Sequence, residues 1–183
     1  MCHRPQPAPS TNAAASLTYY DALTFDGRPT FDVDLNSLRS RFHDLQMRMH
    51  PDHQTSAAQT GCERVAGEAW SAWLNRAYET LRDPMKRAAY LYSLVCHGEA
   101  VTEDGQDAGM TQEDLLLVME ERELIEQGAA VEQVAARNAE RMQDDIDALR
   151  KAFGRGDCRT AKHLINRLRY WETLRAACED KLR

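Results

Sequence analysis

From Asp34 onward, apolar residues recur with the period of an amphipathic helix, and no segment shows the sustained alternation typical of a β-strand. The first strong example is the segment 35–49, whose apolar face consists of Leu38, Phe42, Leu45 and Met49. The whole pattern predicts helices over 17–23, 35–49, about 60–81, 84–97, 111–127, 129–153 and 158–182. We therefore expect an all-α protein.

Several of these predicted helices carry recognisable end signals. Asp34 stands where an N-cap is needed, and Pro51 excludes the helical conformation from the residue before it. Pro84 follows an aspartate and suits the first turn of a helix, while Thr111 is followed by Asp114 with the spacing of a capping box. The ends predicted from periodicity are thus supported by local chemistry.

The helices fall into two groups separated by the segment 98–109, which is acidic, contains glycine and has almost nothing to bury. The segment 17–97 predicts a helical hairpin with a flanking helix on each side. The segment 110–183 carries three amphipathic helices with short connections, which favours a three-helix bundle. Residues 1–16 read as a disordered tail or the remnant of a presequence.

Composition narrows the function. The 183 residues are 43% hydrophobic and carry a formal net charge of −6, which disfavours a broad nucleic-acid-binding surface. No apolar run is long enough to span a membrane, so no membrane partner is expected. The five cysteines are scattered without a C-x-x-C pair, which predicts neither a disulfide framework nor a zinc site and favours a reducing compartment.

The turn after the first long helix places His50, Pro51, Asp52 and His53 in succession. Two histidines and an aspartate could bind a metal or act as a catalytic pair. However, no further His or Cys cluster completes a ligand set, and a tight turn offers no dry concave site. We therefore expect no metal, no cofactor and no catalytic residues here, and the remaining alternatives are a solvated turn or a surface made for a partner.

The flanks of this turn resemble the J-domain of DnaJ-type co-chaperones. A short helix and a basic helix precede HPD, and LNRAYETLRDP (74–84) and KRAAYL (86–91) follow it, so the resemblance covers 17–97. It implies docking on a DnaK-type ATPase chaperone and stimulation of that chaperone's ATP hydrolysis. The residues implied in chaperone binding are His50, Pro51, Asp52, Arg39, Arg41 and Arg48.

This implication agrees with elementary chemistry. A turn stiffened by Pro51 presents the Asp52 carboxylate at low entropic cost for a charge-assisted pair with a partner arginine. The arginines give the helix a local positive excess on a negative chain, which would steer it toward an acidic surface. Without the HPD turn, an ordinary solvated face would be the preferred explanation of the arginines, and beside the HPD turn it is not.

The segment FDVDLNSLRSRFHDLQMRMHPD (31–52) is similar to the HscB family, the J-proteins of iron–sulfur cluster biogenesis. This resemblance implies a non-enzymatic co-chaperone with two domains in an L-shaped arrangement. It also implies an HscA-type or mitochondrial chaperone and an IscU-type scaffold as partners, in a mitochondrial matrix or a bacterial cytoplasm. Weak self-association stays open. The residues implied in scaffold binding are Leu115, Leu116, Met119, Glu120, Glu123 and Tyr170.

Alternatives remain at this point. Leu115, Leu116 and Met119 also fit a bundle core, and we expect this for at least one of them. The chain could serve another client, act as a helical adaptor, or be a small metal-dependent enzyme. His53 departs from the family's usual lysine, and an adjacent tyrosine and tryptophan, Tyr170 and Trp171, cannot both face one core.

Overall fold

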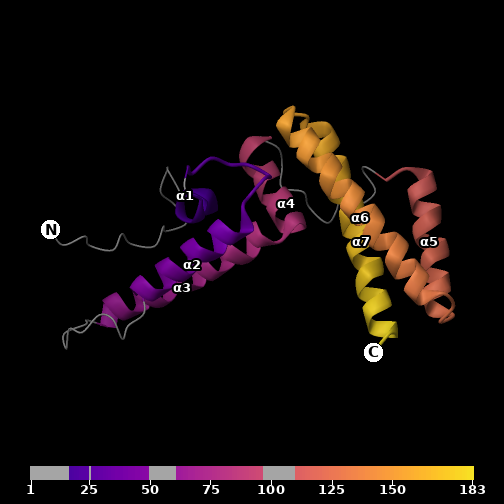
Figure 1. Ribbon diagram of the computed structural model, residues 1–183, viewed down its shortest axis with the longest axis horizontal. Helices are drawn as coiled ribbons and strands as arrows, with labels where there is room; N and C mark the ends of the chain where they lie inside the picture. Colours follow the sequence, from indigo (N-terminus) through magenta and orange to yellow (C-terminus); the bar gives the residue numbers. More distant parts are fainter. Residues whose placement is uncertain (1–16, 25, 50–60, 97–109) are drawn as a thin grey trace. The chain divides into compact units, whose positions relative to one another are not determined.

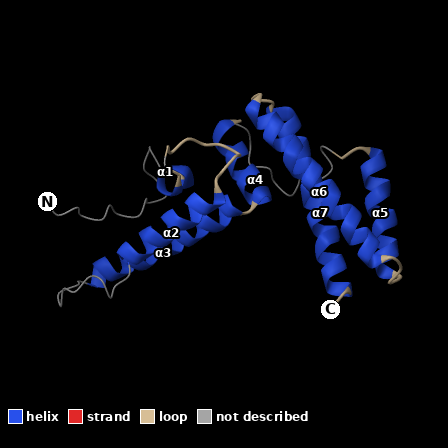
Figure 2. Ribbon diagram, viewed as in Figure 1, coloured by secondary structure: helices blue, strands red, loops and turns tan. Residues whose placement is uncertain are grey.

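The computed structural model describes residues 17–24, 26–49, 61–96 and 110–183. All regular secondary structure in these ranges is α-helical, which confirms the predicted all-α class (Figure 2). Figure 1 shows the helices in chain order: α1 (Tyr19–Leu23), α2 (Leu35–Met49), α3 (Gly61–Arg82), α4 (Pro84–Val95), α5 (Gln112–Glu126), α6 (Val131–Gly154) and α7 (Cys158–Lys181). No helix in the described ranges is long and apolar enough to cross a bilayer.

The chain divides into two compact units, residues 1–86 and 87–183, with the division falling inside α4. The predicted linker, 98–109, lies outside the described residues, and the domain boundaries drawn from the sequence stay a prediction. Each unit has its own set of buried side chains.

The first unit is built on the antiparallel pair α2 and α3, with α1 packed on both (Figure 1). Its core consists of Tyr20, Leu23, Phe31, Leu38, Phe42, Leu74, Ala77 and Leu81. Phe42 stacks on Tyr78 with ring centroids 4.2 Å apart, which joins the two long helices. Leu38 and Phe42 are buried as predicted, whereas Leu45 is only half-buried.

The second unit is centred on the long helices α6 and α7, with α5 packed against both (Figure 1). Its core includes Val118, Ile125, Val134, Leu149, Leu164, Ile165, Leu168, Trp171 and Leu174. On α7 the sequence left Leu174 and Arg175 as alternatives for one core position, and Leu174 is the buried one. The predicted core residue Leu182 is 53% exposed, because α7 ends at Lys181.

Buried charges tie the helices of the second unit together. The Asp145 carboxylate of α6 accepts hydrogen bonds from Nε of Arg167 and from Nε1 of Trp171, each 2.9 Å long. A second contact joins Arg167 Nη2 to Asp145 Oδ1, so the pair is bidentate. This hydrogen bonding to Asp145 raises the pKa of Arg167. Asp145 is 2% exposed, and the pair therefore links α6 to α7 inside the unit.

The turn between α5 and α6 explains why α6 begins later than its periodicity predicts. Gly128 has a φ of 70°, and Ala130, the residue before α6, has a φ of 55°. Both values lie in the left-handed region, where a helix cannot continue. Ala129 and Ala130 fit the apolar pattern of the following helix, so the sequence predicts a start at residue 129, whereas the helix begins at Val131.

The cysteine pattern predicts no disulfide, and this prediction is wrong. Cys96 and Cys158 are joined by a disulfide across a sequence separation of 62 residues, with their Cα atoms 5.6 Å apart. Cys178 is free and buried, and burial raises the pKa of its thiol. Partners so far apart in sequence leave no local spacing signal, which is why the scattered pattern misleads.

Two aspartates cap helices and make part of the stability dependent on pH. Asp157 accepts from the Thr160 backbone N–H at the start of α7 (3.1 Å) and from the Thr160 hydroxyl (2.7 Å). These bonds lower the pKa of Asp157, led by the one from the Thr160 side chain, and a bond from Ser37 does the same at Asp34. A carboxylate with a lowered folded-state pKa stabilises the fold above its unfolded pKa, and this contribution is lost as the pH falls through the folded-state pKa.

We therefore expect Asp157→Asn to destabilise the protein at pH 7 and to have a shrinking effect as the pH falls below about 4, near the unfolded-state pKa of aspartate. Denaturant unfolding of both proteins at several pH values measures the difference. Asp180→Asn, at an exposed position near the far end of the same helix, is the control. An Asp157→Asn effect that stayed constant from pH 7 to pH 3 would contradict the assignment.

Candidate docking surfaces

The HPD residues His50, Pro51 and Asp52 lie outside the described residues, as does His53. The helix that leads to them, α2, is described as far as Met49. Arg39 and Arg48 are exposed on this helix, as a docking surface requires, whereas Arg41 is half-buried. The three arginines that the sequence groups together therefore have different environments.

Arg41 makes a contact within the first unit. Its Nε donates a hydrogen bond of 2.9 Å to the backbone carbonyl of Ala22, at the end of α1. The last carbonyl groups of a helix have no partner within the helix, and a guanidinium supplies a charge-assisted one. Arg41 thus holds α1 on α2, and the cations that face solvent on the docking side of α2 are foremost Arg39 and Arg48.

A second polar contact joins the two long helices of the first unit. Nε2 of Gln46 donates to Oδ1 of Asn75 over 2.9 Å, linking α2 to α3 one turn before α2 ends. Asn75 is exposed and Gln46 is half-buried, and helix periodicity gives no reason to pair these two polar residues. The contact restrains the end of α2 from which the HPD turn continues.

In the second unit, α5 separates its residues into a buried side and an exposed side. Val118, Glu121 and Ile125 are buried, while Leu116 is 53% exposed and Met119 is 68% exposed. Glu120 and Glu123 are exposed beside them. We call Leu116, Met119, Glu120 and Glu123 the outer face of α5. The bundle-core alternative does not hold for Leu116 or Met119, and Leu115 is half-buried, so none of the three lies fully in the core.

A buried carboxylate fixes the orientation of this helix. Glu121 is 3% exposed, and its Oε1 accepts from Nε of Arg137 at 3.2 Å and from Nη1 of Arg141 at 3.0 Å, both on α6. The capping box of Thr111 and Asp114 begins the helix as predicted. Sequence reasoning missed Glu121, although its spacing of three from Val118 and four from Ile125 places it on the buried stripe.

The two adjacent aromatic residues of α7 separate as expected. Trp171 is 2% exposed in the core, where its backbone carbonyl accepts from Nδ2 of Asn138 at 2.8 Å. Tyr170 is half-buried on α7, one of the two helices on which α5 packs. The structure thus assigns the core role to Trp171 and leaves Tyr170 partly accessible on the same bundle.

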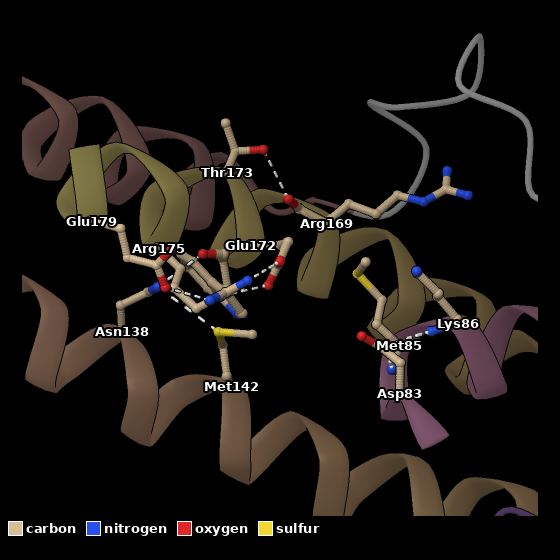
Figure 3. Close-up of polar contacts among 11 residues, drawn as sticks. Asp83, Met85, Lys86, Asn138, Met142, Arg169, Glu172, Thr173, Arg175 and Glu179 are labelled. Atoms are coloured by element: carbon tan, nitrogen blue, oxygen red, sulfur yellow. Dashed lines mark hydrogen bonds and ion pairs between the residues drawn. The ribbon is translucent and has the colours of Figure 1, made fainter. Parts of the chain in front are cut away.

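After Tyr170, charged side chains of α7 form ion pairs with one another. Figure 3 shows Arg175 between Glu172 and Glu179, with Nε of Arg175 2.9 Å from the Glu172 carboxylate. These contacts raise the pKa of Arg175, with the bond to Glu172 as the largest cause. Figure 3 also shows the Thr173 hydroxyl donating to the carbonyl of Arg169, and Asp83 accepting from the amides of Met85 and Lys86 at the start of α4.

Within the described ranges no group of three or more His, Cys, Asp or Glu side chains could hold a metal ion. The metal-binding alternative for His50, Asp52 and His53 concerns residues outside those ranges. The candidate residues in the described ranges form two surfaces: two exposed arginines on α2 and an exposed apolar and acidic face on α5.

Comparison with known proteins finds similar sequences and similar folds. A family model described as the HSCB C-terminal oligomerisation domain matches residues 110–179. The mouse protein named "Iron-sulfur cluster co-chaperone protein HscB" is 31% identical over 157 residues, which are 84% of this chain and 63% of the mouse protein. The chain thus covers less than two thirds of that relative's length.

Solved structures show the same fold. Human HscB matches with a TM-score of 0.81 and 26% identity, covering 96% of this chain and 85% of the human one. Jac1 from Saccharomyces cerevisiae matches with a TM-score of 0.74 and 27% identity, over 92% of this chain and 95% of that one. HscB from Vibrio cholerae has a TM-score of 0.73 and 26% identity, over 89% and 96%. Sequence and fold agree, and the chain belongs to the HscB family.

Proposed function

We propose that this protein is a co-chaperone that binds an IscU-type iron–sulfur scaffold through the outer face of α5 and delivers it to a DnaK-type chaperone. The observation that carries the proposal is the exposure of Leu116 and Met119 on a helix whose opposite side is buried. One mouse relative and one human relative bear the name HscB. The mouse protein is named an iron–sulfur cluster co-chaperone.

The chemistry of the outer face suits a protein partner. Leu116 and Met119 offer an apolar centre, and Glu120 and Glu123 border it with carboxylates. Interfaces commonly combine a desolvated apolar anchor with a polar rim, and methionine is enriched in them. Nε2 of Gln127 donates to Oε1 of Glu123 over 3.0 Å, which orients this carboxylate before any partner binds. A scaffold surface with apolar residues and basic neighbours would match it.

The chaperone contact is assigned to the HPD turn, His50 to Asp52, with Arg39 and Arg48 on the helix before it. In this proposal the protein hydrolyses no ATP itself and accelerates hydrolysis by its partner. Arg41 contributes by holding α1 against α2 through Ala22. The arginines would steer the first unit toward an acidic chaperone surface, an effect that weakens as salt screens the charges.

Two measurements test the proposal as a whole. Calorimetry with a purified IscU-type scaffold should show direct binding, and single-turnover assays with a DnaK-type chaperone should show faster ATP hydrolysis when the protein is added. Scaffold binding without any ATPase stimulation would leave only a helical adaptor, and stimulation without scaffold binding would indicate a J-protein for another client.

The outer face of α5 gives a prediction of its own. Replacing Leu116 and Met119 together by Ala should raise the dissociation constant for the scaffold about 30- to 1,000-fold, because anchor residues at interfaces each contribute about 1–2 kcal/mol. Calorimetry measures the change. The fold should be kept, since both side chains are exposed.

The matched control is Leu182→Ala, which removes an equally exposed leucine from the end of α7. It should leave scaffold affinity unchanged. Stimulation of the chaperone without scaffold should be normal in both variants. Equal affinities for the wild type and the double variant would exclude the outer face of α5 as the docking site.

We place the protein in the mitochondrial matrix, with a bacterial cytoplasm as the alternative. The first twenty residues contain no acidic residue and are rich in Ala, Ser, Thr and Pro, which partly fits an import sequence. Sequencing the mature N-terminus from cells tests this assignment, because cleavage within this segment would indicate import.

A further inference from the structure

The disulfide between Cys96 and Cys158 lies at the ends of two helices. Cys96 follows Val95, the last residue of α4, and Cys158 is the first residue of α7. Without this bond, the covalent path between them follows the chain over a sequence separation of 62, which includes α5 and α6. The bond replaces that long path by a single bridge, so it restrains the end of α4 against the beginning of α7.

Both cysteines are held by ordered backbone. The amide of Cys96 donates to the carbonyl of Tyr92 at 3.0 Å, which extends the helical hydrogen bonding of α4 by one residue. Cys158 follows the N-cap Asp157, whose carboxylate is engaged by Thr160. The Cα separation of 5.6 Å is in the middle of the range for native disulfides. The two thiols therefore belong to defined positions in the fold.

Accessibility separates this pair from the other described cysteine. Cys96 and Cys158 are both half-buried and keep part of their surface in solvent, whereas Cys178 is buried in the core of the second unit. Small thiols and disulfides in solution can reach the first two and not the third. A disulfide at the surface is also the kind that exchanges most readily with a redox buffer.

The environment of Cys158 favours it as the attacking thiol. The Cys158 amide already donates to the carbonyl of Gly156 at 3.1 Å, and the Thr160 amide donates to Asp157. The contribution to thiolate character at this position therefore comes from the helix dipole. Arg159 follows it directly, and Lys162 lies one turn further along the same stripe. Asp157 has the opposite charge, but its carboxylate accepts two bonds from Thr160.

We infer that Cys96 and Cys158 form a reversible thiol–disulfide site that takes its oxidising equivalents from a low-molecular-weight disulfide of the glutathione class. In the first step the Cys158 thiolate attacks one sulfur of glutathione disulfide, and one glutathione thiolate leaves. In the second step the Cys96 thiolate attacks the Cys158 sulfur of the mixed disulfide, and the second glutathione leaves. The protein loses two electrons and two protons, and one glutathione disulfide becomes two glutathione thiols.

The consequence is a redox-dependent restraint on α4. In the oxidised form the end of α4 is bonded to α7, and in the reduced form this bond is absent while both helices keep their own hydrogen bonds. The amide of Cys96 and the first turn of α7 should therefore exchange hydrogen faster in the reduced form. This inference concerns the chain alone and does not depend on the proposed partners.

The experiment uses the full chain with Cys2 and Cys62 replaced by Ser, so that only the pair and Cys178 remain. The protein is equilibrated in glutathione buffers of graded composition, quenched with an alkylating reagent and mapped by mass spectrometry. An about eightyfold change in the ratio of glutathione disulfide to the square of glutathione should move the pair from about one tenth to about nine tenths oxidised. Cys178 should remain a thiol throughout.

Hydrogen exchange at both ends of this range provides the second measurement. The amide of Cys96 and those of the first turn of α7 should exchange several-fold faster in the reduced protein, and Cys158→Ser should exchange at the fast rate in every buffer. A pair that stays reduced at all ratios, or one that stays oxidised in glutathione alone, would overturn the reversible site. Exchange rates independent of the redox state would overturn the restraint.

Discussion

Replacing Asp52 by Asn is expected to abolish stimulation of the chaperone ATPase while leaving scaffold binding intact. The substitution keeps the size of the side chain and removes its charge, so it deletes the charge-assisted pair that we propose with a partner arginine. A hydrogen bond to a charged group is worth more than a neutral one, and breaking such a pair at an interface leaves the partner's charge unpaired. The loss should therefore be close to complete.

Single-turnover ATP hydrolysis by a DnaK-type chaperone measures this effect, and calorimetry with the scaffold is the accompanying control. Glu68→Gln, which neutralises an exposed carboxylate on α3, should keep full stimulation. His50→Gln should behave like Asp52→Asn. If Asp52→Asn stimulated the chaperone as well as the wild type does, the proposed role of the HPD turn would be excluded.

The second large effect concerns stability. Asp145→Ala should lower the free energy of unfolding of the second unit by about 2–4 kcal/mol, because it leaves Arg167 and Nε1 of Trp171 without their shared partner. The expected loss lies below the maximum for fully buried ion pairs, because the Arg167 side chain is 28% exposed to solvent. The loss should be visible in the slowest-exchanging amides of α6 and α7.

Asp147→Ala is the matched control, two positions further along α6. Its carboxylate pairs with Arg150 at 2.6 Å, but both side chains are about half-exposed, and such pairs contribute at most about 1 kcal/mol. Hydrogen exchange and denaturant unfolding of the three proteins give the comparison. Equal losses in the two variants would show that burial of Asp145 adds nothing to stability.

Much of the fold could be predicted from the sequence, because an amphipathic helix leaves a local signal. The apolar spacing gave α2 its observed bounds, and the capping box of Thr111 and Asp114 marked the start of α5. The predicted helix bounds are wrong where the apolar pattern and the backbone conformation indicate different ends. Ala129 and Ala130 fit the apolar pattern of the next helix, although the left-handed backbone at Ala130 delays its start to Val131.

The candidate surfaces were only partly predictable, for a different physical reason. Periodicity places Leu116 and Met119 on a stripe of α5, but it does not say whether a neighbouring helix covers that stripe. Contacts between distant residues have no local pattern at all. The disulfide of Cys96 and Cys158 and the contact between Arg41 and Ala22 become visible only when the chain is folded.

The burial of Glu121 has a consequence for the alignment of the helices. Apolar stripes alone are compatible with several neighbouring registers, since one leucine or valine can replace another at a packing position. Turning α5 by one residue, about 100°, would carry Glu121 away from Arg137 and Arg141, and the arginines would lose their shared acceptor. That cost disfavours the alternative registers. The buried Glu121 thus determines that α5 exposes Leu116 and Met119 on its outer face.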